Sequence, residues 1–258
     1  MWAAGRATPC ACTGPLGSTS APMGRSRWPC RWWRRSLRCA PGDGRDRCAS
    51  AAFRSMPRAT EGLRVGGVVL AAGASRRMGP GRNKMLLELD GEPLARRAAR
   101  RALAAGLTPV VVVLGHEADQ VRAALAGLNC DCVFNPAFTG PTSESLHLGL
   151  RRLGPEAGAV VVMLGDMVRV SDDMLARLIA AGRESEAPLV VSRYGDVTAP
   201  PLLFRRALFD ELLAWTGEGC GKAVVQRHRD SAYYLDWPAE RLADVDTPED
   251  FQRLTSGV

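Results

Sequence analysis

The stretch from Val65 to Lys84 constrains the fold of this chain more strongly than any other. It begins with a continuous apolar run, residues 65–72, which is the pattern of a strand buried on both faces. The chain then enters a loop with three glycines, a proline, three arginines, a serine and a lysine. Small side chains at positions 71–75 let backbone N–H groups approach an anion, and Arg77 and Lys84 add positive charge. The stretch predicts a polyphosphate cradle, although a plain strand-to-helix turn uses the same glycines.

Strands and helices alternate along the chain from residue 65 onward. Apolar runs predict strands at residues 65–72, 109–114, 130–134 and 159–164. Helical patterns with start and stop signals occupy residues 93–105, 118–125, 143–153 and 171–181. The later part is less regular, and we expect its strands at residues 189–192, 202–204 and 233–236. The alternation predicts an α/β fold with a doubly wound, mostly parallel open sheet and helices on both faces.

Residues 1–62 differ in composition from the rest. They contain 11 of the 34 basic residues but only three acidic ones, and they show no sustained periodicity. We interpret them as a disordered basic extension that was translated from an over-early start, with Met56 near the true beginning. A transit peptide and a nucleic-acid-binding arm are the alternatives, since tryptophans stand among these arginines.

The remaining residues, 63–258, are close to neutral. The formal net charge of +7 therefore comes from the extension, and we expect no nucleic-acid partner. No apolar run approaches the roughly 18 residues that would span a bilayer, so we expect no membrane association. None of the eight cysteines forms a C-x-x-C pair, which argues against a zinc site. We expect a cytoplasmic protein.

An aspartate stands at the end of the fourth expected strand. In open α/β sheets ligands bind beyond the carboxyl ends of the strands, and Asp166 follows the apolar run that ends at Leu164. Asp166 could cap the next helix, but Ser171 is the better N-cap and leaves it free. A triphosphate site requires a divalent cation held by one or two carboxylates, which makes Asp166 a candidate ligand.

The glycine loop matches a known signature. The string Leu70-Ala71-Ala72-Gly73 with Arg77-Met78-Gly79 and, slightly further on, Lys84 resembles the L-A-A-G-x-x-x-R-M-G-x-x-K motif of nucleotidyltransferases related to molybdenum cofactor cytidylyltransferase. The resemblance implies that residues 63–258 form an NTP transferase domain of Rossmann-like fold. It implies catalytic roles for Arg77, Lys84 and Asp166. The nucleotide-binding residues that it implies are Leu70, Ala71, Ala72, Gly73, Ser75, Arg77, Lys84, Asn135 and Ser143.

Two further segments carry the resemblance. Gly165-Asp166-Met167 is similar to the family's L-G-D-M-P strand end, with Val168 in place of the proline. Asp244-Val245-Asp246-Thr247-Pro248 is similar to its D-I-D-T-P motif. The resemblance implies that Asp166 and Asp246 hold Mg²⁺, with Asp244 the weaker candidate for the second ligand. Asp246 or Thr247 could instead simply cap the last helix.

The segments expected to contact the nucleobase and the acceptor resemble the family's motifs less closely than the glycine loop does. Residues 134–146, which contain Asn135 and Ser143, resemble the family's N-P-x-x-x-G-M-x-x-S-L element near base and sugar, with one extra residue. Ala72 stands where guanylyl-transferring relatives have glycine, which favours a pyrimidine nucleotide. In the acceptor region, residues 198–204 and 217–222, Lys222 suits an anionic acceptor or is an ordinary surface lysine.

The resemblance implies a Mg²⁺-dependent nucleotidyltransferase. It would transfer CMP from CTP to a phosphorylated acceptor such as molybdopterin cofactor and release pyrophosphate, with a molybdoenzyme or its chaperone as a protein partner. An NAD(P)H-dependent oxidoreductase of the same fold, similar to pyridine-dye (nicotine blue) oxidoreductases, is one alternative, although the G-x-G-x-x-G motif is missing. A non-catalytic molybdenum cofactor binding or insertion protein is another.

Overall fold

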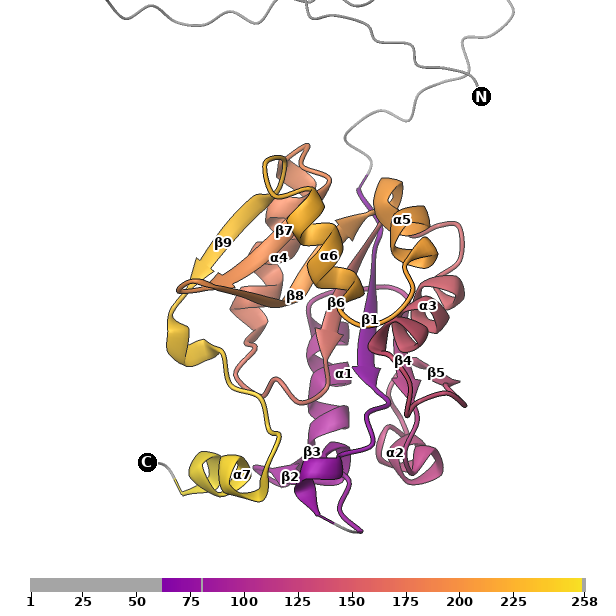
Figure 1. Cartoon of the computed structure of the whole chain (residues 1–258), viewed down its shortest axis with the longest axis vertical. Coiled ribbons are helices and arrows are strands. Elements are labelled where there is room, and N and C mark those ends of the chain that lie inside the picture. Colours follow the sequence, from indigo (N-terminus) through magenta and orange to yellow (C-terminus); the bar gives the residue numbers. More distant parts are fainter. Residues whose placement is uncertain (1–61, 80, 257–258) are drawn as a thin grey trace, which may run out of the picture. The chain divides into compact units, whose positions relative to one another are not determined.

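A seven-stranded sheet forms the centre of the computed structural model, which describes residues 62–79 and 81–256 (Figure 1). The strands are β1 (Val65–Ala71), β4 (Val110–Leu114), β5 (Asp131–Phe134), β6 (Ala159–Leu164), β7 (Leu189–Tyr194), β8 (Val197–Arg205) and β9 (Tyr233–Trp237). Their order in the sheet is β5-β4-β1-β6-β8-β7-β9. Our interpretations of residues 1–61, including the basic extension and Met56, lie outside the described residues.

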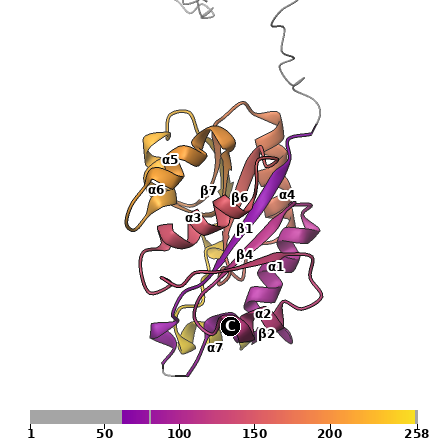
Figure 2. The same ribbon diagram turned by 90° about the vertical axis from the view of Figure 1, so that its right-hand side faces the viewer.

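Helices cover both faces of this sheet. They are α1 (Leu94–Ala104), α2 (Ala118–Ala124), α3 (Thr142–Arg152), α4 (Asp172–Glu184), α5 (Phe209–Ala214), α6 (Cys220–Arg227) and α7 (Pro248–Thr255). Helices α1, α2 and α4 lie on one face and α3, α5 and α6 on the other (Figure 2), and each set contributes side chains to the core on its own side. The doubly wound, mostly parallel open sheet expected from the sequence is therefore confirmed.

Strand β1 lies in the interior of the sheet because it is apolar on both faces. Val65 and Val69 belong to the core under α1 and α4, whereas Val68 belongs to the core under α3. β1 runs parallel to both of its neighbours, with Val68 level with Val111 of β4 and Val162 of β6. A strand with this pattern cannot sit at an edge without exposing valines to water, so its position follows from its composition.

Strand β8 departs from the alternation seen in the first half of the chain. It pairs antiparallel with both β6 and β7 and covers Val197–Arg205, more than the predicted residues 202–204. The chain reverses between β7 and β8 at Gly195, whose φ of 59° is in the left-handed region that glycine tolerates. A tight reversal joins antiparallel neighbours without a helix, which explains why strict alternation ends here.

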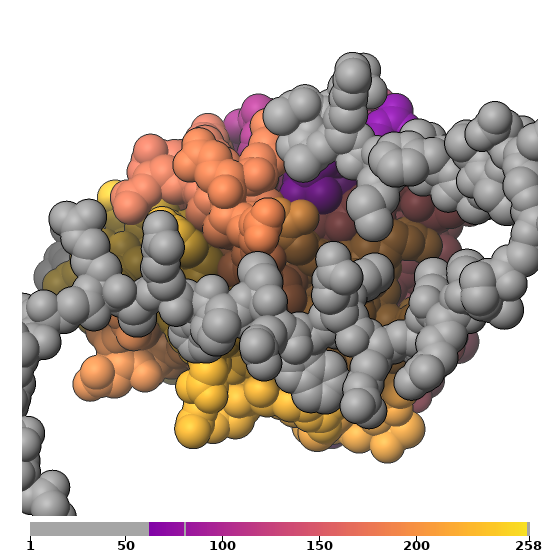
Figure 3. All heavy atoms as spheres, turned by 90° about the horizontal axis from the view of Figure 1, so that it is seen from above, coloured from indigo at the N-terminus to yellow at the C-terminus, as the bar shows by residue number. Residues whose placement is uncertain are grey.

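The carboxyl ends of β1 and β6 are covered by the loop after β1 and by the last segment of the chain. α7 packs there through a small apolar cluster that includes Met78, Leu94, Val168 and Val245. Figure 3 looks onto the opposite end, where β1 begins. A search of residues 62–79 and 81–256 finds no helix with the length and apolar character that a membrane crossing requires.

Candidate active site

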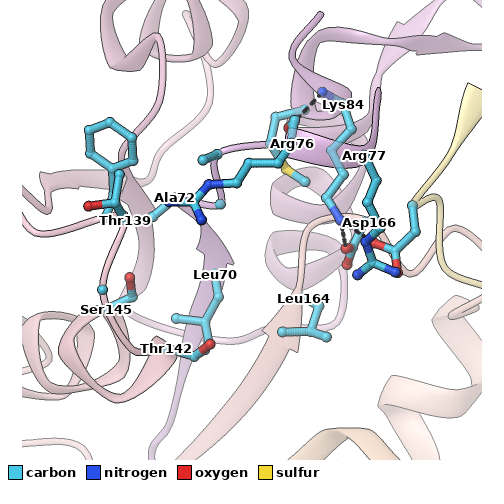
Figure 4. A pocket seen from close by; sticks show the side chains of 17 residues that line it. Leu70, Ala72, Arg76, Arg77, Lys84, Thr139, Thr142, Ser145, Leu164 and Asp166 are labelled. Atoms are coloured by element: carbon cyan, nitrogen blue, oxygen red, sulfur yellow. Dashed lines mark hydrogen bonds and ion pairs between the residues drawn. The ribbon is translucent and has the colours of Figure 1, made fainter. Parts of the chain in front are cut away.

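A cavity of about 460 Å³ lies at the carboxyl ends of β1 and β6 (Figure 4). The loop after β1 forms one wall, and residues 138–145 before and within α3 form another. Leu70 and Leu164 come from the strand ends, and Asp246 comes from the segment before α7. The sequence predicted a ligand site beyond the carboxyl ends of the strands of an open α/β sheet, and the cavity lies at that position.

Hydrogen bonds within the loop after β1 fix its shape. Ser75 has φ 52°, an uncommon value for a residue with a side chain. Its Oγ accepts a hydrogen bond from Lys84 N at 3.1 Å, which closes the loop. Asn83, which is 5% exposed, donates from Nδ2 to the carbonyl oxygen of His116 at 2.9 Å and accepts from Met85 N at 3.0 Å. These bonds hold Lys84 at the cavity wall and tie the loop to the end of β4.

Two basic and two acidic side chains converge on one side of the cavity. Lys84 Nζ donates to Asp166 Oδ2 and, at 2.9 Å, to Asp246 Oδ1. Arg77 Nη1 lies 2.9 Å from Asp246 Oδ2. Figure 4 shows the Lys84 side chain reaching down to Asp166 with the Arg77 side chain beside it, and Thr139 and Ser145 on the far side of the cavity. Burial alone would lower the pKa of Lys84, but attraction to Asp166 and Asp246 outweighs it and raises that pKa.

The two carboxylates suit a hard divalent cation that also binds phosphate oxygens. Asp166 is 9% exposed, and its Oδ1 is buried without a hydrogen-bond partner among residues 62–79 and 81–256, which leaves an oxygen to bind a cation. Among the described residues no group of three or more His, Cys, Asp or Glu side chains forms a metal site. Mg²⁺ commonly takes one or two carboxylates together with substrate phosphates and water, so two carboxylates fit this role.

The position of Asp246 follows from the start of α7. Thr247 and Asp250 form a capping box, in which Thr247 Oγ1 accepts from Asp250 N at 3.2 Å. An antiparallel bridge between Met167 and Asp244 joins this segment to the end of β6, and Val245 N donates to Asp166 O. Thr247 is thus the cap, Asp246 faces the cavity, and Asp244 is exposed and does not line it.

The wall opposite the four charged groups carries mainly hydroxyl side chains. Phe138, Thr139, Thr142 and Ser145 line the cavity there. Gly115 permits the close approach of this wall, since a Cβ at that position would lie 2.3 Å from Ala72 O and 2.4 Å from Phe138 Cβ. The resemblance placed residues 134–146 near base and sugar, but within that segment only Asn135 and Ser143 were named as binding residues.

The predicted nucleotide-binding residues divide into two groups. Most of them line the cavity: Leu70, Ala72, Gly73, Ser75, Arg77 and Lys84. Ala71, Asn135 and Ser143 do not. Asn135 is 1% exposed and uses its side chain internally, donating to Ser145 Oγ at 2.9 Å and accepting from Ala137 N at 2.9 Å. Through these contacts Asn135 positions the cavity wall that residues 138–145 form.

Comparison with curated proteins gives two kinds of relative. "Bifunctional protein GlmU" of Anaeromyxobacter sp. (strain Fw109-5) is 36% identical over 132 residues, which is 50% of this chain. The chain spans only 27% of the length of that relative. Molybdenum cofactor guanylyltransferase of Cereibacter sphaeroides is 32% identical over 197 residues, which cover 75% of this chain and 97% of the relative.

Solved structures and a family model also match most of the chain. Rv0371c of Mycobacterium tuberculosis H37Rv is 32% identical, with a TM-score of 0.67 over 75% of this chain and 98% of that one. Rv0371c has also been solved in complex with manganese, and that structure has a TM-score of 0.65 over 76% of this chain and 100% of that one. The model of the MobA-like NTP transferase domain matches residues 67–232. The chain therefore belongs to the MobA-like NTP transferase family.

Proposed function

We propose that this protein transfers CMP from CTP to a phosphorylated acceptor of the molybdopterin type and releases pyrophosphate. One observation carries the proposal: Arg77, Lys84, Asp166 and Asp246 converge beside a small-residue loop at the end of a central strand. The cations suit a triphosphate, and the carboxylates suit its divalent cation. The curated guanylyltransferase relative supports an acceptor from molybdenum cofactor biosynthesis.

The reaction is an in-line displacement at phosphorus. An oxygen of the acceptor's phosphate forms a bond to the α-phosphorus, the bond from that phosphorus to the α–β bridging oxygen breaks, and pyrophosphate leaves with the bonding electrons. Such transfer depends on positioning and charge neutralisation and needs no covalent intermediate on the protein. Backbone N–H groups of residues 72–75, which line the cavity, would bind the triphosphate, and Arg77 and Lys84 would stabilise negative charge on the leaving group.

Asp166 and Asp246 would hold a divalent cation, which we propose to be Mg²⁺. When bound, this ion neutralises negative charge on the triphosphate. The ion pairs of Lys84 with the same carboxylates imply that Lys84 turns from the carboxylates to the phosphates when nucleotide and cation bind. Asp244 is the less favoured ligand because it is exposed and lies outside the cavity.

The choice of CTP over GTP rests on Ala72. Ala72 lines the cavity and is 3% exposed. Position 72 carries a methyl group here, whereas guanylyl-transferring relatives have glycine. This methyl group would narrow the part of the cavity that holds the base, and a narrower space favours the smaller pyrimidine. GTP is the alternative donor, since the relative that matches over nearly its whole length is a guanylyltransferase. Thermal shifts with each of the four NTPs, with and without Mg²⁺, decide between them, because specific binding stabilises the native state.

Two substitutions test the proposed site. Arg77→Ala and Asp166→Ala should each abolish pyrophosphate release while the circular dichroism spectrum stays unchanged. Matched controls are Arg82→Ala and Asp244→Ala, because both residues are exposed neighbours that do not line the cavity. Turnover that survives in the Arg77 or Asp166 variant, or that is lost equally in the controls, would contradict the assignment.

A further inference from the structure

Arg76 is a cation of the candidate active site that the proposed phosphate chemistry does not use. Three basic side chains line the cavity: Arg76, Arg77 and Lys84. Arg77 pairs with Asp246, and Lys84 pairs with Asp166 and Asp246. In the part of the chain that the structure describes, the exposed Arg76 guanidinium has no ion-pair or hydrogen-bond partner. Its five N–H donors are therefore available to a ligand.

The local backbone separates Arg76 from its neighbours in the sequence. Residues Arg76–Met78 form a short 3₁₀ helix, in which consecutive side chains point about 120° apart because each turn holds three residues. Met78, which is 3% exposed, points into the apolar cluster on which α7 packs. Arg77 points to Asp246, with 2.9 Å between Nη1 and Oδ2. The third direction remains for Arg76.

This third direction leads across the cavity. Figure 4 shows the Arg76 side chain extending away from Asp166, toward the side where Ala72 and Thr139 lie. Residues 138–145 form the wall of the cavity on that side. If the triphosphate lies along the loop after β1 and toward the two carboxylates, the base must lie on this other side, because the rest of the cavity is there. Arg76 is then on the base side of the cavity.

A guanidinium can distinguish the four bases through hydrogen bonds. It carries only donors, in a rigid planar fork that matches two adjacent acceptors. Guanine presents O6 and N7, the pair that arginine reads in DNA, and cytosine presents O2 and N3. In adenine the amino group stands beside N1 and N7, and in uracil N3–H stands between the two carbonyl oxygens. A donor of these bases would therefore face a donor of the guanidinium, and the lost hydrogen bond costs affinity.

We propose that Arg76 selects the nucleobase by donating two hydrogen bonds to adjacent acceptors, so that the site takes cytosine or guanine nucleotides and rejects ATP and UTP. This inference rests on the proposed nucleotidyl transfer, because it requires the triphosphate to lie along the loop after β1. Arg76 differs in this role from Arg77 and Lys84, which act on the phosphates. The choice between CTP and GTP stays with Ala72.

The test is calorimetric titration of the full chain with each of the four NTPs and Mg²⁺. No acceptor is added, so no transfer consumes the nucleotide. The wild type should bind CTP or GTP at least about tenfold more tightly than ATP and UTP, which is the low end of what a bidentate arginine contributes. Arg76→Met keeps an apolar stem at this exposed position but removes the donors. It should bind the preferred nucleotide about tenfold more weakly and ATP and UTP as the wild type does.

Two nucleotide analogues test the acceptor atoms one at a time. In 7-deaza-GTP carbon replaces the guanine N7, and in 3-deaza-CTP carbon replaces the cytosine N3. The wild type should bind the analogue of its preferred nucleotide more weakly than the parent compound. Arg76→Met should bind analogue and parent equally, because the donor that distinguishes them is gone. A merely structural effect of the substitution would leave the difference between analogue and parent in place.

Inorganic pyrophosphate with Mg²⁺ separates the base from the phosphates. Arg76→Met should bind it as the wild type does, whereas Arg77→Met should bind it more weakly. The matched control is Arg82→Met, at an exposed position of the same loop that does not line the cavity, and it should match the wild type in every titration. The inference is overturned if Arg76→Met keeps the wild-type base preference. It is also overturned if this variant weakens all four NTPs and pyrophosphate alike, which would assign Arg76 to the phosphates.

The proposed function and the role of Arg76 fail in different ways. If the wild type binds no NTP with Mg²⁺, the proposed function fails, and this inference fails with it. If the wild type binds NTPs but takes ATP and UTP as readily as CTP and GTP, only the assignment of Arg76 fails.

Discussion

Lys84 links the stability of the protein to its candidate active site. Its ammonium group lies between the Asp166 and Asp246 carboxylates and pairs with both. Replacing it with methionine keeps much of the apolar stem but leaves two carboxylates facing each other. Arg77 still neutralises Asp246, so the uncompensated charge falls mainly on Asp166, whose side chain is only 13% exposed.

The expected magnitude follows from that burial. Removing one partner of a fully buried ion pair costs about 3–5 kcal/mol. Here water reaches part of all three side chains, since those of Lys84, Asp166 and Asp246 are 13%, 13% and 24% exposed. We therefore expect Lys84→Met to lower the free energy of unfolding by about 2 kcal/mol, which corresponds to a Tm lower by about 4–8 °C in a domain of this size.

A divalent cation should restore the stability that the Lys84→Met variant loses. In wild type the cation must displace Lys84 from the carboxylates, whereas in the variant it does not. Added Mg²⁺ should therefore raise the Tm of Lys84→Met more than that of wild type, although turnover should fall by about 10²–10³-fold through loss of a charge-stabilising group. Thermal unfolding in EDTA and in graded Mg²⁺ measures the effect.

Lys222→Met is the matched control, because it removes the other lysine from an exposed position. The Tm of Lys222→Met in EDTA should match that of wild type, and added Mg²⁺ should raise the Tm of both proteins by the same amount. The reasoning is refuted if Lys84→Met is as stable as wild type in EDTA and gains no more from Mg²⁺.

Two further substitutions test the elements that position the site. Thr247→Ala removes the cap of α7 and should lower stability by about 1 kcal/mol in urea unfolding. Hydrogen bonds from the Thr247 side chain and backbone lower the pKa of Asp250. Their contribution is therefore full above the unfolded pKa of about 4 and is lost as pH falls through the lower folded pKa, so the stability deficit of Thr247→Ala should shrink on acidification. Gly149→Ala would place Cβ 2.5 Å from Val68 Cγ1 and should cost about 1–3 kcal/mol, whereas Arg151→Ala, exposed on the same helix, should cost little.

The parts of the fold that sequence predicted well are those set by local pattern. β1 was predicted at residues 65–72 and observed at Val65–Ala71, because an uninterrupted apolar run is buried wherever it lies in a sheet. Ser171 was correctly identified as the cap of α4, and its side chain accepts a hydrogen bond from Met174 N. β8 was predicted too short, since a strand beside a tight reversal carries prolines and polar residues that hide it.

The candidate site likewise has features that the sequence predicted and features that only the structure revealed. The loop, its small residues and its cations were visible in the sequence as one contiguous string. The importance of Asn83 was not, because its hydrogen bond to His116 O joins two loops 33 positions apart. Ser143 was assigned to the nucleotide, but it lines a separate cavity between α3, β8 and α6, and only the orientation of α3 decides which cavity a residue of that helix faces.

The sequence by itself therefore determined the alternating architecture, the small-residue cationic loop after β1 and the carboxylates that we propose hold a cation. These depend on side-chain type and short-range spacing, which a chain carries before it folds. Tertiary structure alone decided that Lys84 lies between Asp166 and Asp246, 162 positions from the second, and that Arg77 pairs with Asp246 as well. Such relations arise only when the order of strands in the sheet brings distant strand ends to one edge.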